Sequence, residues 1–195
     1  MKFFEKIRDY IRISGVAPIG RRYFIMNAFD GATTVLGIVI GAYVAEIANE
    51  FWVIWSGLGA TIAMSLSGFV GAYMTEEAER TRKLNSLEKS MLKKLENSVV
   101  GKASRFASLL VAIIDGGSPA VAAIACLAPF FLSSSGAFSI NFAIQLSIAI
   151  AFSVMFLLGL FLGRVSGRHM LFQGVKMLLV GLILTLVLLV LKAIT

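Results

Sequence analysis

The chain has one cysteine, one histidine and three prolines among its 195 residues. The lone cysteine, Cys126, cannot form an intramolecular disulfide, and its apolar neighbours in the sequence favour a packing role. The lone histidine, His169, excludes a site built from paired histidines. Charged residues are also scarce, at 15% of the chain, whereas hydrophobic residues make up 58%. This balance is too apolar for an ordinary soluble domain and indicates an integral membrane protein.

Long apolar runs dominate the sequence. A helix needs about 20 apolar residues to cross a bilayer, and runs near that length occur at 24–45, 52–74, 106–132, 140–163 and 171–193. The sequence therefore predicts an all-α, polytopic membrane protein with five transmembrane helices. We divide it into a basic amphipathic N-terminal segment (1–23), transmembrane helices 1 and 2 (24–74), a cytoplasmic amphipathic helical linker (75–105) and transmembrane helices 3 to 5 (106–195).

The two segments outside the spans carry apolar residues at helical spacing. These are Phe3, Phe4, Ile7, Tyr10 and Ile11 in the first segment, and Leu84, Leu87, Met91, Leu95 and Val99 in the linker. Basic residues accompany the first set, namely Lys2, Lys6, Arg8 and Arg12. We expect this N-terminal helix to meet anionic lipid headgroups, unless it is a solvated basic tail. The linker helix is expected to lie on the membrane or to pack on its partner.

Positive charge is distributed unevenly over the connections between spans. Six lysines or arginines precede the first span, eight lie within residues 80–105, and Arg164 and Arg168 follow the fourth span. The connections 46–51 and 133–139 contain none. By the positive-inside rule, the N-terminus is cytoplasmic and the C-terminus lies outside. The net charge of +7 thus reflects topology and anionic lipid, and we do not infer nucleic-acid binding from it.

Asp30 lies inside the first apolar run. A carboxylate within a span costs roughly 3 kcal/mol on insertion scales, so it marks a cation or proton site by default. The alternative is a structural aspartate that Asn27 or Thr34 satisfies from the same helix face.

Small residues at steps of three or four draw a stripe down each of the first two spans. Such residues let helix backbones approach closely, so the stripes are expected to face each other or a symmetry mate. The glycines to which we assign this packing role are Gly37, Gly41, Gly68 and Gly71.

Met64 in the second span is expected at a similar depth to Asp30. Counting about 1.5 Å per residue from the cytoplasmic side, Asp30 lies roughly 10 Å deep and Met64 roughly 15 Å deep, so both could touch one ion. A thioether is a soft ligand that favours iron-like, copper or zinc ions over calcium or magnesium. Below the second span, Glu76, Glu77 and Glu79 either recruit cations to the mouth of a pathway or only begin a solvated helix. Our candidate metal-site residues are Asp30, Met64, Glu76 and Glu79.

Asp115 opens a turn of small residues in the third span. The sequence of residues 115–119, DGGSP, follows the same pattern as DGATT at 30–34, which suggests two parallel repeats. Asp115 is therefore a second candidate for proton coupling beside Asp30, and Pro119 would weaken the helix there. The alternative is an ion pair of Asp115 with Arg105 or Lys176.

The motifs around Asp30 and Met64 resemble the vacuolar iron transporter family. The resemblance rests on residues 30–37 (DGATTVLG), 63–76 (AMSLSGFVGAYMTE) and 167–181 (GRHMLFQGVKMLLVG). It implies a homodimer that exports iron or manganese in exchange for protons, along a pathway near the dimer interface. It also implies that Asp30 binds the ion and the proton, that Met64 is a metal ligand, and that no cofactor is permanently bound besides the transported ion.

The chain departs from that family between spans two and three. Many members carry there a longer helical domain with several glutamates that gather ferrous ions, whereas residues 75–104 here are short and net basic. Beyond the acidic cluster, this segment has only Glu88 and Glu96.

No catalytic constellation is found in the sequence, so we do not expect an enzyme. One function that fits is proton-coupled export of divalent metal across the cell membrane. The alternative is a non-catalytic membrane scaffold, or an exporter of another small solute, in which the intramembrane acids serve helix packing.

Overall fold

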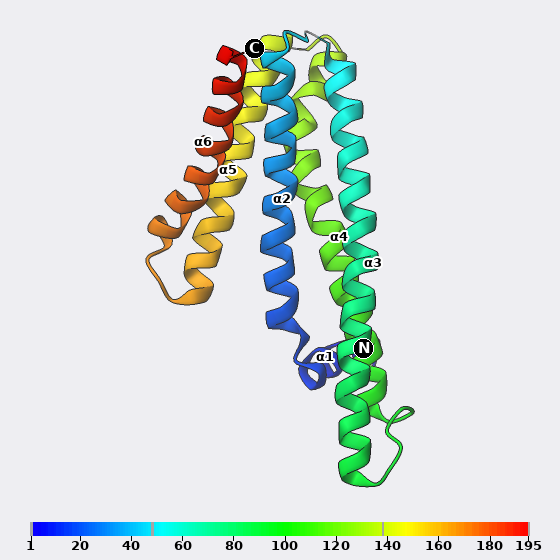
Figure 1. The fold of residues 1–195 in the computed structure, drawn as a ribbon. Helices are drawn as coiled ribbons and strands as arrows, with labels where there is room; N and C mark the ends of the chain where they lie inside the picture. The colour runs from blue at the N-terminus through cyan, green and yellow to red at the C-terminus, as the bar shows by residue number, and fades with distance from the viewer. Residues whose placement is uncertain (1, 48, 138, 195) are drawn as a thin grey trace. The chain divides into compact units, whose positions relative to one another are not determined.

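The structure is a computed structural model that describes residues 2–47, 49–137 and 139–194. The regular elements in these ranges are all helices: α1 (Lys2–Ser14), α2 (Val16–Val44), α3 (Glu50–Met91), α4 (Val99–Ser134), α5 (Ile140–Ser166) and α6 (Met170–Ile194) (Figure 1). Helices α2 to α6 are long and apolar enough to cross a membrane. The predicted all-α fold with five transmembrane helices is confirmed.

The chain forms two compact units. The first comprises Met1–Phe24 and Ser65–Gly117, and the second comprises Ile25–Met64 and Ser118–Thr195. The division falls inside α2, α3 and α4, so each of these helices contributes to both units.

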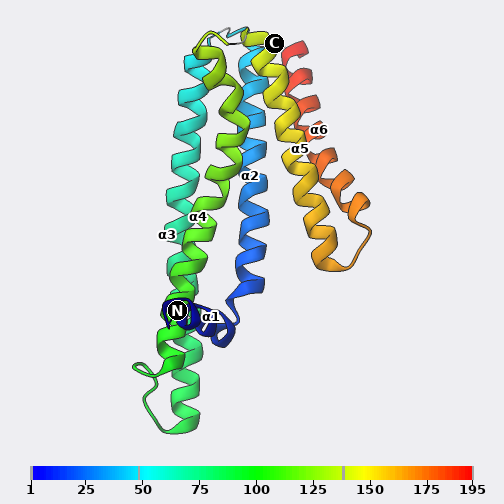
Figure 2. The ribbon, with the colours of Figure 1, turned by 180° about the vertical axis from the view of Figure 1, so that it is seen from behind.

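In the first unit, α1 is a separate helix that ends at Ser14 and is followed by Gly15. This glycine has φ +60°, a left-handed conformation that ends a helix without the steric cost of a Cβ. Helix α1 lies beside α3 and α4 (Figure 2). Its Ile11 packs against a cluster that contains Ala72 of α3 and Val111 of α4. Of the predicted apolar face, Ile7, Tyr10 and Ile11 are half-buried, whereas Phe4 is 77% exposed. The side chains of Lys2 and Phe3 lie outside the described residues.

Helix α3 is longer than a bilayer requires. Its 42 residues extend about 63 Å at 1.5 Å per residue, about twice the 30 Å of a hydrocarbon core. The charged part from Glu76 onward therefore lies beyond the membrane. A short turn follows, closed by the Glu88 carboxylate, which accepts a hydrogen bond from the Leu95 N–H at 2.6 Å. Residues 75–105 are thus the end of α3, this turn and the start of α4.

The core of the second unit joins α2, α4 and α5. Val35 and Leu36 of α2, Leu127 and Phe130 of α4, and Met155 of α5 are each at most 1% exposed. Helices α5 and α6 form an antiparallel hairpin (Figure 1). A Cβ built on Gly159 would lie 2.6 Å from the Cα of Gly174, so the two backbones touch where both residues are glycine. Most of the remaining surface of α6 is apolar and exposed, as a lipid-facing helix requires.

Candidate functional site

Asp30 lies on α2 in the second unit and is exposed in the single chain. Gly31 and Ala32, which follow it, are buried. Thr33 donates a hydrogen bond to the backbone oxygen of Asp30 at 3.1 Å. Within residues 2–47, 49–137 and 139–194, no hydrogen bond or ion pair reaches the Asp30 carboxylate. The carboxylate is thus open to an ion, a proton or another chain.

Thr34, one helical turn after Asp30, contacts Met64. Its hydroxyl donates a hydrogen bond to the Met64 Sδ at 3.4 Å, and both side chains are half-buried. Residues four apart on a helix lie on one face, so the Met64 thioether sits beside the turn that follows Asp30. The structure therefore brings Met64 to the face of α2 that carries Asp30.

Gly31 allows α2 and α4 to approach closely next to Asp30. A Cβ at this position would collide with the backbone carbonyl oxygen of Pro119. Pro119 has no N–H and lies inside α4. The small residue after Asp30 is therefore required by backbone packing.

Asp115, the second predicted proton-coupling residue, is buried at 6% exposure on α4 in the first unit. Its Oδ2 lies 2.7 Å from the position of a Cβ built on Gly68 of α3. A Cβ built on the next residue, Gly116, would lie 2.6 Å from the Ser65 carbonyl oxygen. A carboxylate thus lies directly at the crossing of α3 and α4.

The two cations considered as partners for Asp115 make other contacts. Arg105 forms an ion pair with Glu96, with 2.6 Å between Nη2 and Oε1. Lys176 lies over the Phe172 ring, 4.7 Å from its centroid.

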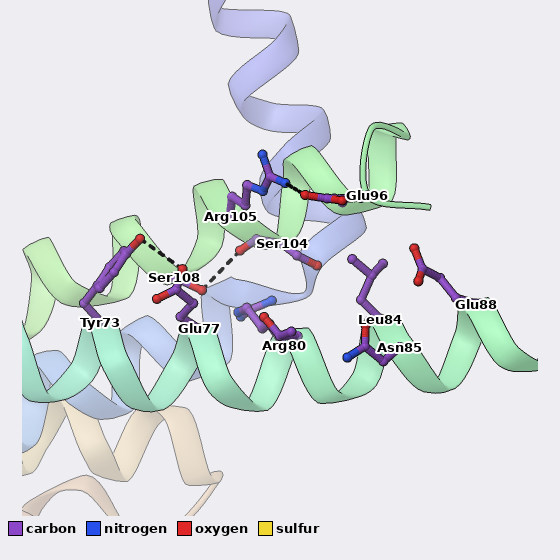
Figure 3. Close-up of a pocket in the computed structure, with 12 residues that line it drawn as sticks. Tyr73, Glu77, Arg80, Leu84, Asn85, Glu88, Glu96, Ser104, Arg105 and Ser108 are labelled. Carbon is purple, nitrogen blue, oxygen red and sulfur yellow. Dashed lines mark hydrogen bonds and ion pairs between the residues drawn. The ribbon is translucent and has the colours of Figure 1, made fainter. Parts of the chain in front are cut away.

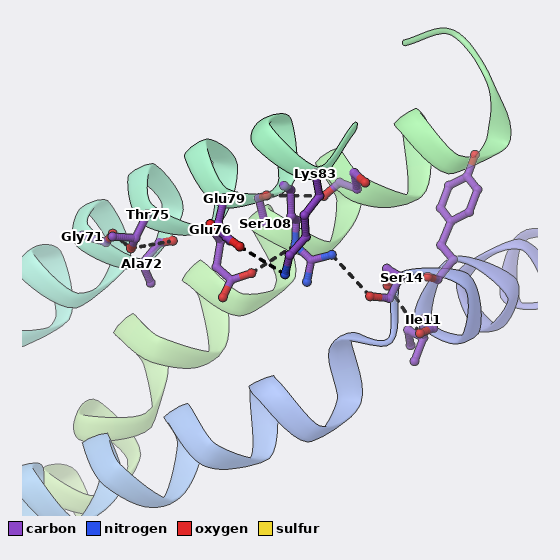
Figure 4. Close-up of polar contacts among 12 residues, drawn as sticks. Ile11, Ser14, Gly71, Ala72, Thr75, Glu76, Glu79, Lys83 and Ser108 are labelled. Carbon is purple, nitrogen blue, oxygen red and sulfur yellow. Dashed lines mark hydrogen bonds and ion pairs between the residues drawn. The ribbon is translucent and has the colours of Figure 1, made fainter. Parts of the chain in front are cut away.

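Glu76 is half of a largely buried ion pair. The Arg80 Nε donates to Glu76 Oε2 at 3.0 Å, and the two side chains are 11% and 13% exposed. Arg80 also donates through Nη1 to the backbone oxygen of Ser14 at 3.3 Å (Figure 4). Arg80 therefore ties the end of α1 to α3 through one guanidinium group.

Glu79 is more exposed and also paired. It contacts Arg82 at 3.0 Å and Lys83 at 3.3 Å. The hydrogen bonds from Arg82 and then Lys83 hold the pKa of Glu79 below its ordinary value. Both candidate acids at the end of the second span are thus neutralised by cations of the same helix.

A pocket of about 420 Å³ lies between the end of α3 and the start of α4 in the first unit (Figure 3). Its acidic lining residues already have partners. Glu77 accepts from the Tyr73 hydroxyl at 3.3 Å, and Glu96 is held by Arg105. Among the described residues, no three His, Cys, Asp or Glu side chains gather to hold a metal ion.

The four predicted packing glycines have different surroundings. Gly68 is in close contact with Asp115, and Gly37 has an ordinary contact with Leu184, 3.9 Å from a built Cβ. A Cβ on Gly41 or Gly71 would meet nothing within 4 Å in the single chain.

Comparison with known proteins identifies the family. Residues 21–112 match the VIT family. An uncharacterized protein of Methanocaldococcus jannaschii is 33% identical over 161 residues, which is 81% of each chain. The chain belongs to the VIT family. No solved structure matches its sequence.

Membership of the VIT family confirms the resemblance seen in the motifs and suggests a metal-ion transporter. The part that matches the VIT family contains Asp30, Met64, Glu76 and Glu79, and it ends before Asp115. The pairs Glu76–Arg80 and Glu79–Lys83 were readable from their spacing of four residues. Sequence reasoning missed the hydrogen bond from Thr34 to Met64, because the rotation of α3 about its axis decides which residue faces Thr34.

Proposed function

We propose that the chain exports a divalent metal ion, iron or manganese, from the cytoplasm in exchange for protons, with Asp30 and Met64 as intramembrane ligands. The observation that carries this proposal is the carboxylate of Asp30, which has no bonding partner among the described residues and lies one turn from Thr34, whose hydroxyl contacts the Met64 thioether. A structural aspartate in a span is normally paired. An open carboxylate beside a soft sulfur suits a divalent cation of intermediate softness.

The exchange follows from competition at one carboxylate. A proton and a metal ion cannot both occupy the same oxygen atoms of Asp30. Metal arriving from the cytoplasm displaces the proton, and a proton arriving from outside displaces the metal. The gradient of one ion then drives the transport of the other in the opposite direction. No separate energy-supplying domain is needed.

We further propose that a second copy of the chain covers Asp30. The residue is exposed in the single chain, and a carboxylate facing lipid at this depth costs roughly 3 kcal/mol or more. Gly41 and Gly71, which have open space around them, would let a neighbouring helix approach. A symmetric dimer would also add a second carboxylate and a second thioether to the site.

The proposed orientation places the long end of α3 in the cytoplasm of a cell whose plasma membrane holds the protein. Lysines and arginines are concentrated within residues 80–105 and before α2. In this orientation Glu76 and Glu79 lie at the cytoplasmic mouth of the pathway. Their cationic partners make them weak recruiters of metal, so Asp30 and Met64 account for most of the metal binding.

Proton flux in proteoliposomes tests the proposal. Purified protein is reconstituted with a pH-sensitive dye inside, and ferrous, manganous or zinc ion is added outside. We expect a metal-dependent pH change with the wild type and none with Asp30→Asn, which removes the charge but keeps the size. Asp9→Asn on the exposed side of α1 is the matched control and is expected to transport normally. Size-exclusion chromatography verifies that each variant is folded.

Two results would contradict the proposal. The first is flux that persists in Asp30→Asn, because the exchange would then not pass through this carboxylate. The second is no flux with any metal from folded, oriented protein, which would favour a scaffold or an exporter of another solute.

A further inference from the structure

The two adjacent threonines after Asp30 use their hydroxyls differently. Thr33 donates to the carbonyl oxygens of Phe29 at 2.9 Å and Asp30 at 3.1 Å. This is the usual arrangement for a threonine inside a helix. Thr34 instead donates to the Met64 sulfur on α3 at 3.4 Å. Its hydroxyl therefore holds a side chain of another helix.

Met64 needs such a contact if its sulfur is to act as a ligand. A methionine side chain has three rotatable bonds and adapts to many positions. Thr34 is β-branched, so its own rotamer is restricted in a helix. A stiff donor that bonds a flexible thioether fixes where the sulfur lies. The sulfur has two lone pairs, so it can accept this hydrogen bond and still bind a metal through the other.

Thr34 holds the Met64 sulfur at the helical turn that follows Asp30. Thr34 follows Asp30 by one turn on the same face, about 6 Å along the helix axis. Groups that hydrogen-bond to a metal ligand fix its orientation, and their loss typically weakens metal binding by about 10- to 100-fold.

We propose that Thr34 is a positioning residue that fixes the Met64 thioether beside Asp30 and thereby sets the preference of the site for softer metals. This inference rests on the proposed function, because it assumes a metal ion at Asp30 and Met64. Thr34 is not itself a ligand. It acts on the metal through the sulfur.

Metal binding by the purified full-length protein tests this role. Titration calorimetry with Cd²⁺, a soft ion, and Mn²⁺, which prefers oxygen ligands, measures affinity without transport. We expect Thr34→Val to weaken Cd²⁺ binding about tenfold, the low end of the range for ligand-orienting groups, and to change Mn²⁺ binding less than about twofold. Thr34→Ser keeps the hydroxyl and is expected to bind both ions like the wild type. Thr33→Val, which removes a hydroxyl one residue away, is the matched control.

A double-mutant cycle shows whether Thr34 acts through the sulfur. In Met64→Leu there is no sulfur to position, so adding Thr34→Val should cause no further loss of Cd²⁺ affinity. Equal losses for both metals in Thr34→Val, a further loss in the Met64→Leu background, or no loss at all would overturn the proposal. Thr34→Ala replaces Thr34→Val in each comparison if the valine variant does not fold.

Asp30→Asn separates failure of this proposal from failure of the proposed function. If Asp30→Asn abolishes binding while Thr34→Val has no effect, only the role of Thr34 is refuted. If Asp30→Asn binds Cd²⁺ and Mn²⁺ like the wild type, or if the wild type binds neither, the metal site itself is refuted and the role of Thr34 with it.

Discussion

The Oδ2 atom of Asp115 lies 2.7 Å from the point where a Cβ would stand on Gly68. Gly68→Ala therefore forces the buried Asp115 side chain to rotate away from the crossing of α3 and α4. We expect the variant to lose about 1–3 kcal/mol of unfolding free energy, as overpacked cores do. Thermal unfolding in detergent, followed by circular dichroism, measures the change.

The identity of the obstructing atom can be checked in the same assay. Asp115→Asn keeps the size of the side chain, so the clash with Gly68→Ala should remain. Asp115→Ala should remove it and reduce the cost of Gly68→Ala. A Cβ on Gly59, on the same helix, would meet nothing within 4 Å, so Gly59→Ala is expected to be neutral or stabilising by up to about 1 kcal/mol. If Gly68→Ala were as stable as Gly59→Ala, the close contact would be refuted.

Gly31→Ala is expected to be more damaging than Gly68→Ala. The atom that a Cβ would strike is the backbone carbonyl oxygen of Pro119, which cannot rotate away like a side chain. Helices α2 and α4 must then separate, at an expected cost of about 3 kcal/mol or more. The yield of monodisperse protein and its unfolding temperature report the effect.

Gly37→Ala is the matched control for Gly31→Ala, since Gly37 lies on the same helix and a Cβ there would make only an ordinary contact with Leu184. Replacing Pro119 by alanine should not rescue Gly31→Ala, because the carbonyl oxygen remains. If Pro119→Ala did restore the stability of Gly31→Ala, the obstructing atoms would belong to the proline ring.

The five spans were predictable because hydropathy alone sets them. The continuity of α3 to Met91 was not, because the sequence predicted a separate amphipathic helical linker over 75–105, and hydropathy does not report whether a charged segment continues a span without a break. The turn closed by Glu88 and Leu95 is a tertiary detail that no periodicity reports.

The candidate site was predictable in part for a similar reason. The spacing of Asp30 and Thr34 follows from the helical repeat, so their common face could be read from sequence. Which atom the Thr34 hydroxyl reaches depends on how α2 and α3 are rotated about their axes. In the same way, the rotation of α3 relative to α4 decides that Gly68, rather than Gly71, meets Asp115.

Arg80→Gln is expected to loosen α1. The substitution removes the ion pair with Glu76 and the hydrogen bond to the Ser14 carbonyl. It leaves a mostly buried carboxylate without its partner, and we expect a loss of about 1–3 kcal/mol. Limited trypsin digestion should cleave faster after Arg12 than in the wild type.

Adding Glu76→Gln to Arg80→Gln should restore part of the stability, because no uncompensated charge then remains. The Arg82 side chain is 77% exposed and pairs with Glu79 on the surface. Arg82→Gln is therefore the control for loss of a surface ion pair, and it should change the unfolding free energy by at most about 1 kcal/mol. Equal effects of Arg80→Gln and Arg82→Gln would contradict the proposed role of Arg80 in tying the end of α1 to α3.

Releasing Glu79 from its cations is expected to strengthen metal recruitment. Arg82 and Lys83 lower the pKa of Glu79, so their pairing stabilises the folded chain above the pKa of an unfolded glutamate. That contribution is lost as the pH falls through the lowered pKa of the folded state. In Arg82→Gln/Lys83→Gln the pKa returns toward its ordinary value and the free carboxylate attracts divalent cations near the pathway. We expect the metal KM for transport at neutral pH to fall about two- to fivefold.

The gain in recruitment should disappear when Glu79 is removed. In Glu79→Gln, the double substitution at Arg82 and Lys83 has no carboxylate to release, so it should leave KM unchanged. A fall in KM that persists in this background would mean that removing positive charge from α3 acts on the metal directly, through the general field at the mouth. Measuring KM at 10 mM and 150 mM salt adds a second check. The effect of a released exposed charge should shrink at the higher ionic strength, where the Debye length is about 8 Å.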